Sequence, residues 1–175
     1  MNNVNTGTED WVDILVGLGA NLSEPEKNID LAADKIAHLS GVKQIKLSPK
    51  YFTEPQDLKN QPWFVNAAGL YQASAAQWTP RSFLKALLEI EDIMGRERKT
   101  KQGPRIVDLD LLIFGETKIA SPGLTLPHPR MHKRAFVLVP VLNICPELCF
   151  PGGTKVKEML EEIDYTFCAN KIWQK

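Results

Sequence analysis

Residues 103–114 read G-P-R-I-V-D-L-D-L-L-I-F, and the last four residues of this run, Leu111 to Phe114, are all apolar. Ile, Val, Leu and Phe are strand-forming residues, so the run predicts a strand over about 105–114. Asp108 and Asp110 lie two residues apart within it. Because side chains on a strand alternate faces, we expect both carboxylates on one face, roughly 6–7 Å apart.

Two carboxylates at that spacing repel one another. The repulsion amounts to about 0.6 kcal/mol in water and about 2.5 kcal/mol at an effective dielectric constant near 20. In a largely apolar strand the pair is therefore expected to need a cation. Oxygen ligands favour hard ions, which predicts Mg²⁺. The alternative interpretation is a solvated strand face that binds no metal.

A basic segment comes directly before this strand and contains one acid, Glu97, among five cations: Arg96, Arg98, Lys99, Lys101 and Arg105. Gly103-Pro104 predicts a turn that directs Arg105 toward the start of the strand. One arginine can bind two phosphate oxygens at once, while a metal ion held by carboxylates bridges other phosphate oxygens. The combination indicates a metal-bound polyphosphate; the alternatives are a solvated charge run and a nucleic-acid patch.

Composition narrows the function classes. The 175 residues carry 21 basic and 21 acidic side chains, so no overall positive charge points to nucleic acid as the main partner. The three cysteines, Cys145, Cys149 and Cys168, form no Cys-x-x-Cys pair, which predicts no disulfide framework or zinc site and favours a reducing cytoplasm. No run has the length of a membrane span or the flanks of a secretory signal. Residues 1–10 are expected to be disordered, and 11–175 to form one domain.

The order of expected elements predicts the fold class. Periodicity and turn residues predict a strand over 11–18, a helix from Ser23–Pro25 to Gly41, strands over 42–53 and 64–72, a helix from Thr79–Pro80 to Gly95, and the strand over 105–114. This order is that of an α+β, ferredoxin-like βαββαβ core. A Pro-rich loop is expected over 121–130, followed by helices around 132–143 and 154–163.

Three further segments carry candidate chemistry. Gly17 to Asn21 read G-L-G-A-N, which indicates either a nucleotide-binding loop or a tight strand-to-helix turn. Residues 126–134, L-P-H-P-R-M-H-K-R, predict a basic loop that reaches phosphates from the side opposite 96–105, or an ordinary exposed loop. Phe64 and Phe136 each lie two residues from a polar side chain. They are core residues unless their rings face each other, in which case a flat heterocycle can stack between them.

Taken together, these segments resemble the 6-hydroxymethyl-7,8-dihydropterin pyrophosphokinase family of folate biosynthesis. The likeness rests on G-L-G-A-N-L at 17–22, Tyr51 to Asn66, Glu91 to Arg98, G-P-R-I-V-D-L-D-L-L at 103–112, and L-T-L-P-H-P-R-M-H-K-R-A-F-V-L at 124–138. The last two motifs, in this order and about ten residues apart, are highly specific for the family.

The resemblance implies a ferredoxin-like fold with additional C-terminal strands and helices. It implies transfer of the ATP β,γ-diphosphate to the pterin hydroxymethyl group, leaving AMP. By position, Asp108 and Asp110 resemble the ligands of two Mg²⁺ ions. The other implied roles are catalysis for Arg96 and Arg105; ATP binding for Arg98, Lys99, Leu111, Thr125, His128 and Arg134; and pterin binding for Thr53, Phe64, Asn66 and Phe136.

Some positions depart from the family pattern: Gln102 stands where tryptophan is common, Ala20 where serine is usual, and Phe64 where tyrosine is common. The implied partners are ATP and a pterin, and neither nucleic acid nor a membrane is expected. The implied protein is a cytoplasmic monomer, and it can associate with neighbouring folate enzymes. Two rival hypotheses remain. One is a metal-dependent nucleotidyltransferase, which releases pyrophosphate, and the other is a non-catalytic module that binds RNA or a small effector.

Overall fold

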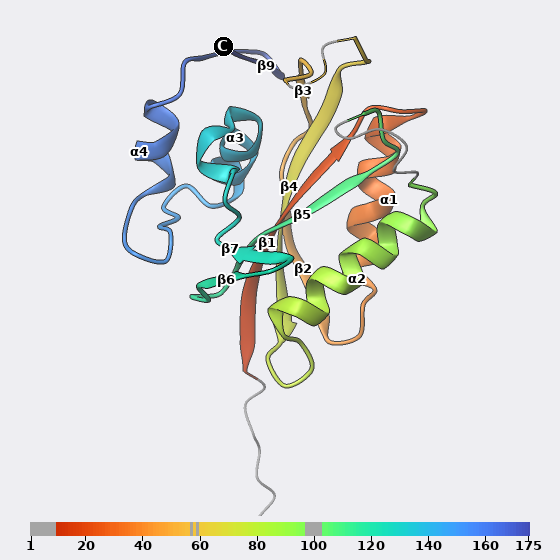
Figure 1. The fold of residues 1–175 in the computed structure, drawn as a ribbon, viewed down its shortest axis with the longest axis vertical. Coiled ribbons are helices and arrows are strands. Elements are labelled where there is room, and N and C mark those ends of the chain that lie inside the picture. The colour runs from red at the N-terminus through yellow and green to blue at the C-terminus, as the bar shows by residue number, and fades with distance from the viewer. Residues whose placement is uncertain (1–9, 57, 59, 97–102) are drawn as a thin grey trace, which may run out of the picture.

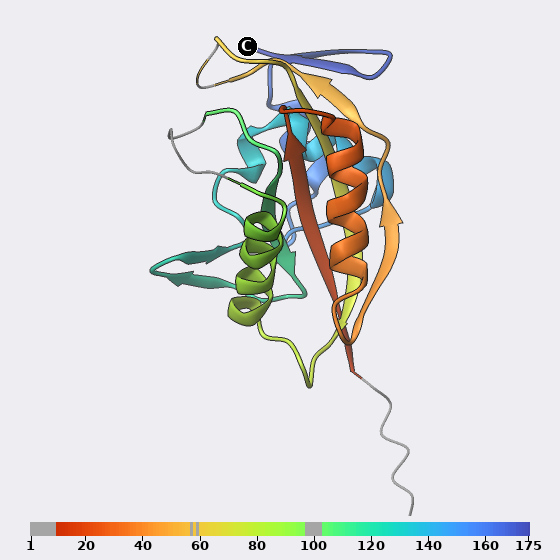
Figure 2. The same cartoon turned by 90° about the vertical axis from the view of Figure 1, so that its right-hand side faces the viewer.

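A seven-stranded sheet forms the centre of the protein, with helices on both of its faces (Figures 1 and 2). The structure, a computed structural model, describes residues 10–56, 58, 60–96 and 103–175. The strands are β1 (Trp11–Ala20), β2 (Val42–Leu47), β3 (Tyr51–Thr53), β4 (Phe64–Ser74), β5 (Asp108–Phe114), β6 (Ile119–Ser121), β7 (Leu124–Leu126), β8 (Tyr165–Cys168) and β9 (Lys171–Gln174). The helices are α1 (Pro25–Ala37), α2 (Pro80–Ile93), the 3₁₀ helix η1 (Met131–Lys133), α3 (Ala135–Ile144) and α4 (Val156–Glu161).

The strand order places β1 inside the sheet, between β4 and the edge strand β5. The order is β5-β1-β4-β3-β9-β8, with β2 also paired to β4. β1 runs antiparallel to both β4 and β5, whereas β9 joins β3 in parallel. β6 and β7 form a separate two-stranded hairpin. The mixed α+β class predicted from the sequence is therefore confirmed, and β5, which carries the aspartate pair, lies beside β1.

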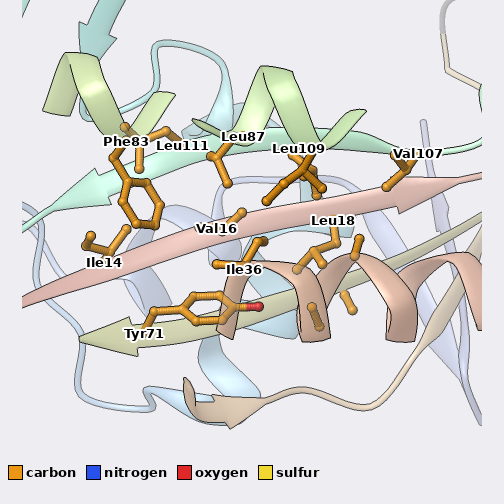
Figure 3. Packing of buried hydrophobic residues seen from close by; sticks show 14 of the residues in the cluster. Ile14, Val16, Leu18, Ile36, Tyr71, Phe83, Leu87, Val107, Leu109 and Leu111 are labelled. Carbon is orange, nitrogen blue, oxygen red and sulfur yellow. The ribbon is translucent and has the colours of Figure 1, made fainter. Parts of the chain in front are cut away.

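Helices α1 and α2 cover one face of the sheet and enclose the larger core (Figure 3). The predicted apolar stripe of α1, from Ile29 to Ile36, is buried there, and so are Phe83 and Leu87 of α2. The ring of Phe83 packs edge-on against Trp78, with the ring centroids 5.4 Å apart. Burial of each such side chain stabilises the fold by about 2 kcal/mol.

Helices α3 and α4 cover the opposite face over a second core that includes Leu112, Met131, Leu138 and Ile172. Strand alternation places Asp108 and Asp110 on the same face as Leu112. The carboxylate pair therefore points toward the layer that contains α3 rather than toward α1 and α2.

Both ends of α2 follow from local sequence. Thr79 caps the helix: its side chain accepts a hydrogen bond from Ser82 N, and Ser82 Oγ accepts one from Thr79 N. This reciprocal cap, with Pro80 at the first helical position, stabilises the start by about 1 kcal/mol. After the helix, Gly95 has φ +83°, which lets Arg96 N donate to Glu91 O. Thr79, Pro80 and Gly95 thus bound the helix as predicted.

Two strand predictions need correction. The strand expected over 42–53 is two strands, β2 and β3, because Pro49 lacks the N–H that a ladder requires. Ser48 bridges the gap instead, since its Oγ accepts from Ala68 N at 2.9 Å. β1 continues to Ala20, two residues past its expected end, so the glycines of 17–21 lie inside a strand and form neither a turn nor a nucleotide loop.

The remaining differences concern boundaries. β5 begins at Asp108 rather than near 105, because the backbone of Arg105 pairs with Asn21. The loop expected over 121–130 contains most of the β6–β7 hairpin, whose turn is Pro122-Gly123. Helix α1 ends at Ala37, four residues before Gly41. The helices expected around 132–143 and 154–163 are α3 and α4, with later starts.

The extension expected to be disordered, residues 1–10, lies outside the described residues except for Asp10. The three cysteines are free thiols. In the part of the chain that the structure describes, no helix combines the length and apolar character needed to cross a bilayer.

Candidate active site

The floor of the site is a patch of the sheet in which glycines separate polar side chains. Gly19 of β1 lies between Asp108 on β5 and Asn66 on β4, and Gly17 lies next to Asp110. A Cβ atom at Gly19 would lie 3.0 Å from Asn66 Oδ1. Because glycine has no side chain, these two positions leave an open space between the carboxylates and Asn66. This space explains why the 17–21 motif contains two glycines.

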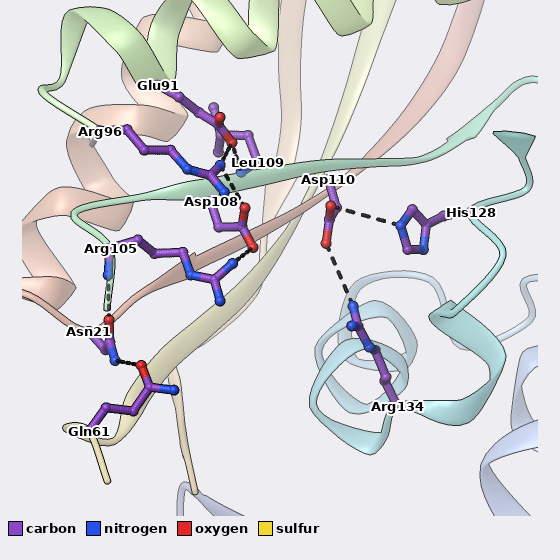
Figure 4. Close-up of polar contacts among 10 residues, drawn as sticks. All are labelled: Asn21, Gln61, Glu91, Arg96, Arg105, Asp108, Leu109, Asp110, His128 and Arg134. Atoms are coloured by element: carbon purple, nitrogen blue, oxygen red, sulfur yellow. Dashed lines mark hydrogen bonds and ion pairs between the residues drawn. The ribbon is translucent and has the colours of Figure 1, made fainter. Parts of the chain in front are cut away.

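Asp108 is held by two arginines (Figure 4). Its Oδ2 atom lies 2.6 Å from Arg105 Nη1, and its Oδ1 atom lies 2.7 Å from Arg96 Nη1. The Nε atom of Arg105 is buried and has no hydrogen-bond partner among the described residues. A buried donor without a partner is costly, so this N–H would be satisfied by an oxygen of an anionic ligand.

Glu91, at the end of α2, supports this arrangement from behind. Its side chain is 1% exposed, pairs with the guanidinium of Arg96, and accepts a hydrogen bond from Leu109 N at 2.7 Å. One carboxylate thus links α2, β5 and a site arginine. Glu91 belongs to one of the motifs shared with the family, but the motif predicted no role for it. The available signal was a charged residue four positions after Leu87 on the buried stripe.

Asn21 organises the other side of the Arg105 loop. Its Oδ1 atom accepts from Arg105 N at 2.8 Å, and its own backbone N–H donates to Arg105 O at 3.1 Å. The Nδ2 atom donates to Gln61 Oε1 at 3.1 Å and to Pro62 O at 3.0 Å. Asn21 therefore joins the end of β1 to two loops. This role was missed because hydrogen bonds between distant segments leave no local pattern.

Asp110 has looser contacts than Asp108. His128 Nε2 and Arg134 Nη1 each lie 3.9 Å from its carboxylate oxygens. Burial, followed by the nearby charge of Asp108, raises the pKa of Asp110, although His128 and Arg134 oppose the shift. Burial also disfavours the charged form of His128 and so lowers the pKa of that side chain. Asp110 is therefore a carboxylate whose ionised form would be stabilised by an added cation.

A cavity of about 290 Å³ opens above this floor. Two phenylalanines form part of its walls, and each has an arginine over its ring: Arg105 Cζ lies 5.2 Å from the Phe64 centroid, and Arg134 Cζ lies 5.4 Å from that of Phe136. The predicted residues that line the cavity are Thr53, Phe64, Asn66, Arg105, Asp108, Asp110, His128, Arg134 and Phe136. At the polar end, Asn66 Nδ2 donates to Thr53 Oγ1 at 2.8 Å.

A second hollow of about 330 Å³ adjoins the first. Leu111 and Thr125 line it, as do Leu84 of α2 and Pro129. Asp110 and His128 line both hollows. Two ligands bound in these spaces would therefore meet at Asp110 and His128.

The structure brings most predicted site residues together. All described members line one of the two hollows, except Arg96, which reaches the site through its pair with Asp108. Arg98, Lys99 and the departure Gln102 lie outside the described residues. In the basic loop over 126–134, His132 and Lys133 are exposed, whereas Arg130 lines the cavity without having been singled out.

The donor set at Asp108 and Asp110 fits magnesium that arrives with a phosphate ligand. Within the described ranges, no cluster of three or more His, Cys, Asp or Glu side chains forms a complete metal cage. Mg²⁺ does not need one, because it is usually bound through one or two carboxylates, waters and substrate phosphates. The two carboxylates meet the protein's share of that coordination.

The fold and site define an α+β protein whose paired carboxylates and arginines adjoin an aromatic cavity, a class of site suited to phosphate-bearing ligands. The family model of 7,8-dihydro-6-hydroxymethylpterin-pyrophosphokinase (HPPK) matches residues 15–146. The chain belongs to this family, and its relatives are enzymes named as pyrophosphokinases.

Among the relatives, the 2-amino-4-hydroxy-6-hydroxymethyldihydropteridine pyrophosphokinase of Pseudomonas aeruginosa is 39% identical over 147 residues, which cover 84% of this chain and 89% of that protein. The Methylorubrum extorquens enzyme of the same name is 36% identical, over 85% of this chain and 92% of that protein. The folic acid synthesis protein fol1 of Pneumocystis carinii is 36% identical over 86% of this chain but only 20% of its own length.

Solved structures support the fold. The wild-type HPPK-DHPS protein of Plasmodium falciparum matches with a TM-score of 0.68 at 12% identity. The match covers 95% of this chain and 50% of that one, so this chain spans about half the length of that protein. At such low identity the likeness shows the fold alone.

Proposed function

We propose that this chain transfers the β,γ-diphosphate of ATP to the hydroxymethyl group of 6-hydroxymethyl-7,8-dihydropterin and releases AMP, as a step of folate biosynthesis. Membership of the pyrophosphokinase family supports the reaction. The observation that carries the proposal for this chain is that Asp110 and His128 line both hollows. The two-hollow geometry suits a donor and an acceptor that react where they meet.

We assign the aromatic cavity to the pterin. Phe64 and Phe136 would contact its flat faces, and Thr53 and Asn66 would bind its polar edge. For the ring to stack, Arg105 and Arg134 would have to leave the faces of these phenylalanines. After leaving the rings, both arginines would bind phosphate oxygens of the other ligand instead.

We assign the second hollow to ATP, with Leu111 and Thr125 near the adenine and ribose. His128 and Arg134 would bind phosphates at the junction, joined by Arg98 and Lys99 of the basic segment. Arg96 and Arg105 would neutralise the charge that develops on the transferred group. The buried Arg105 Nε, without a partner among the described residues, supports this role.

The chain's own part in the reaction is positioning and charge neutralisation. Diphosphate transfer to a hydroxyl requires in-line alignment more than a covalent nucleophile, and we assign no cavity side chain that role. Two Mg²⁺ ions held by Asp108 and Asp110 would supply charge neutralisation and would lower the pKa of the acceptor hydroxyl. Asn21 and Glu91 would keep Arg105 and Arg96 in place.

The finer architecture and setting are also proposals. The order β5-β1-β4-β3, with β2 also on β4, supports a ferredoxin-like core. We further infer a cytoplasmic monomer that can associate with neighbouring folate enzymes. Support for that association comes from the longer relatives fol1 and HPPK-DHPS, in which a matching region is part of a larger chain.

Product analysis tests the reaction. The protein is incubated with ATP, Mg²⁺ and 6-hydroxymethyl-7,8-dihydropterin, and AMP and pyrophosphate are measured, with controls that lack pterin or contain EDTA. Stoichiometric AMP that requires both pterin and metal is expected. Pyrophosphate release would indicate a nucleotidyltransferase, and the absence of any pterin-dependent product from folded protein would leave the binding module.

A further inference from the structure

The C-terminal hairpin β8–β9, residues 165–174, lies beyond the residues that the family model matches, 15–146, yet it is built into the site. Figure 1 shows β9 beside β3 at the end of the sheet next to α3. Thr53 of β3 pairs with Ile172, which is 1% exposed, and Phe52 N donates to Asn170 O at 2.8 Å. The hairpin is therefore an integral part of the sheet that carries Thr53.

Gln174, in β9, binds the segment between η1 and α3 at two points. Its Oε1 atom accepts from Ala135 N at 2.8 Å, and its Nε2 atom donates to Lys133 O at 2.7 Å. Ala135 is the first residue of α3, and the first N–H groups of a helix have no partner within the helix. Arg134, at the capping position, has no side-chain capping bond. Gln174 thus supplies from a distant strand the acceptor that the helix start lacks locally.

These two hydrogen bonds lie on either side of Arg134. The backbone there is extended, with φ −128° and ψ 102°, between two helical segments. Arg134 directs its guanidinium toward Asp110 and over the ring of Phe136, both of which line the cavity. Gln174 thus bonds the peptide group on each side of Arg134, in addition to the backbone bonds from Arg134 N to Met131 O and from Val137 N to Arg134 O. The direction of Arg134 and the place of Phe136 therefore depend in part on Gln174.

The same strand also contacts the opposite wall. Trp173, next to Gln174, packs edge-on against Trp63, with ring centroids 5.9 Å apart and an interplanar angle of 85°. Trp63 immediately precedes Phe64, the other aromatic wall. One short strand therefore touches the segments that carry both phenylalanines.

We propose that Gln174 is a positioning residue that orients Arg134 and Phe136, and that strand β9 sets the spacing between the two aromatic walls of the cavity. The identity of the two ligands rests on the proposed function, whereas the argument for a positioning role rests on the observed contacts of Gln174. The C-terminal hairpin is thus a determinant of substrate binding rather than only a stabilising addition to the sheet.

The test uses the full chain with Gln174→Met and Gln174→Glu. Methionine keeps the approximate volume but makes neither hydrogen bond, whereas glutamate keeps the acceptor for Ala135 N–H and loses the donor to Lys133 O. We expect Gln174→Met to raise KM for both ATP and pterin by about tenfold, with kcat changed less than about threefold. Gln174→Glu should recover part of the loss. Amide hydrogen exchange at Ala135 should be faster in Gln174→Met than in Gln174→Glu.

Gln72→Ala is the matched control, because Gln72 also uses its side-chain amide in one sheet hydrogen bond, to Asp13 Oδ1 at 3.0 Å, and is not among the cavity-lining residues. Its kinetic constants should match the wild type. KM values of Gln174→Met within about twofold of wild type would overturn the proposal, and so would equal exchange at Ala135 in the two Gln174 variants. If the wild type forms no pterin-dependent AMP, the proposed function fails, while the exchange measurement still decides the role of Gln174.

Discussion

The two aspartates of β5 lie on one face of one strand but have different surroundings. Asp108 contacts two arginines at 2.6 and 2.7 Å, and these are held in turn by Glu91 and Asn21. Asp110 has a histidine and an arginine no nearer than 3.9 Å, and burial raises its pKa. The difference teaches that the protein itself neutralises the Asp108 carboxylate, whereas the Asp110 carboxylate is left for a ligand to complete.

This asymmetry has a physical reason. The Asp108 end lies where α2, β5 and the Arg105 loop meet, so buried groups from three segments can satisfy one another. The Asp110 end lies at the boundary of two hollows, which the described residues leave open. Paired charges are therefore concentrated at Asp108, where the Arg105 Nε atom is the unsatisfied group, whereas the Asp110 carboxylate itself lacks a close cation, as expected where function competes with stability.

The largest effect should come from Asp110→Asn. The variant keeps the shape but removes a charged ligand for the metal, so turnover should fall by about 10³-fold or more. Its unfolding midpoint in urea should equal or exceed that of the wild type, because the raised pKa means that the folded state disfavours the ionised form. Steady-state AMP formation and urea denaturation measure the two effects.

Asp13→Asn is the control for this variant. Asp13 lies on β1 and accepts a hydrogen bond from Gln72, but it is not among the residues that line the cavity. The turnover of Asp13→Asn should equal that of the wild type. A loss of less than tenfold in Asp110→Asn would contradict the assignment of Asp110 as a metal ligand.

The next effect should come from Arg105→Ala, which removes one of the two arginines that contact Asp108. Since Arg105 is expected to act on charge that develops in the transition state, kcat should fall by about 10²-fold while ATP affinity changes less than about threefold. Single-turnover kinetics and ATP binding by calorimetry separate the two quantities. Equal losses in both would instead indicate ordinary ground-state binding.

The smallest effect on chemistry, and the largest on folding, should come from Glu91→Gln. Removing the charge leaves Arg96 buried beside Asp108 with weaker compensation, so the free energy of unfolding should fall by about 3 kcal/mol. Urea denaturation measures this change. Glu89→Gln is the control, because Glu89 forms an exposed pair with Lys85 at 3.4 Å and should change stability by less than about 0.5 kcal/mol. A similar small change in Glu91→Gln would show that the buried network is not important for stability.

Much of the fold was predictable because its signals are local. Thr79, Pro80 and Gly95 bound α2 as expected, and the buried stripe of α1 follows from helical spacing. Errors occurred where distant contacts overrode local preference. Arg105 was predicted to lie in a strand, but its backbone pairs with Asn21 instead. Residues 121–126 were predicted to be a loop, but they form most of a hairpin around Pro122-Gly123.

The residues of the candidate site also fall into those that local sequence predicts and those that depend on distant contacts. Sequence alone placed Asp108 and Asp110 on one face, because strand alternation requires no knowledge of the partner strands. It could not assign roles to Glu91, Asn21 or Gln174, because each acts through hydrogen bonds to segments between 18 and 84 residues away.

The sequence by itself determined the order of the elements from β1 to β5, apart from the break between β2 and β3, as well as the shared face of the two aspartates and the family to which the chain belongs. These depend on short-range spacing and motifs. Only the tertiary structure decided which aspartate is enclosed by arginines and which borders both hollows. It also decided that a C-terminal glutamine holds the start of α3. Burial and hydrogen bonding between distant segments arise when the sheet assembles, and no local pattern in the chain specifies them.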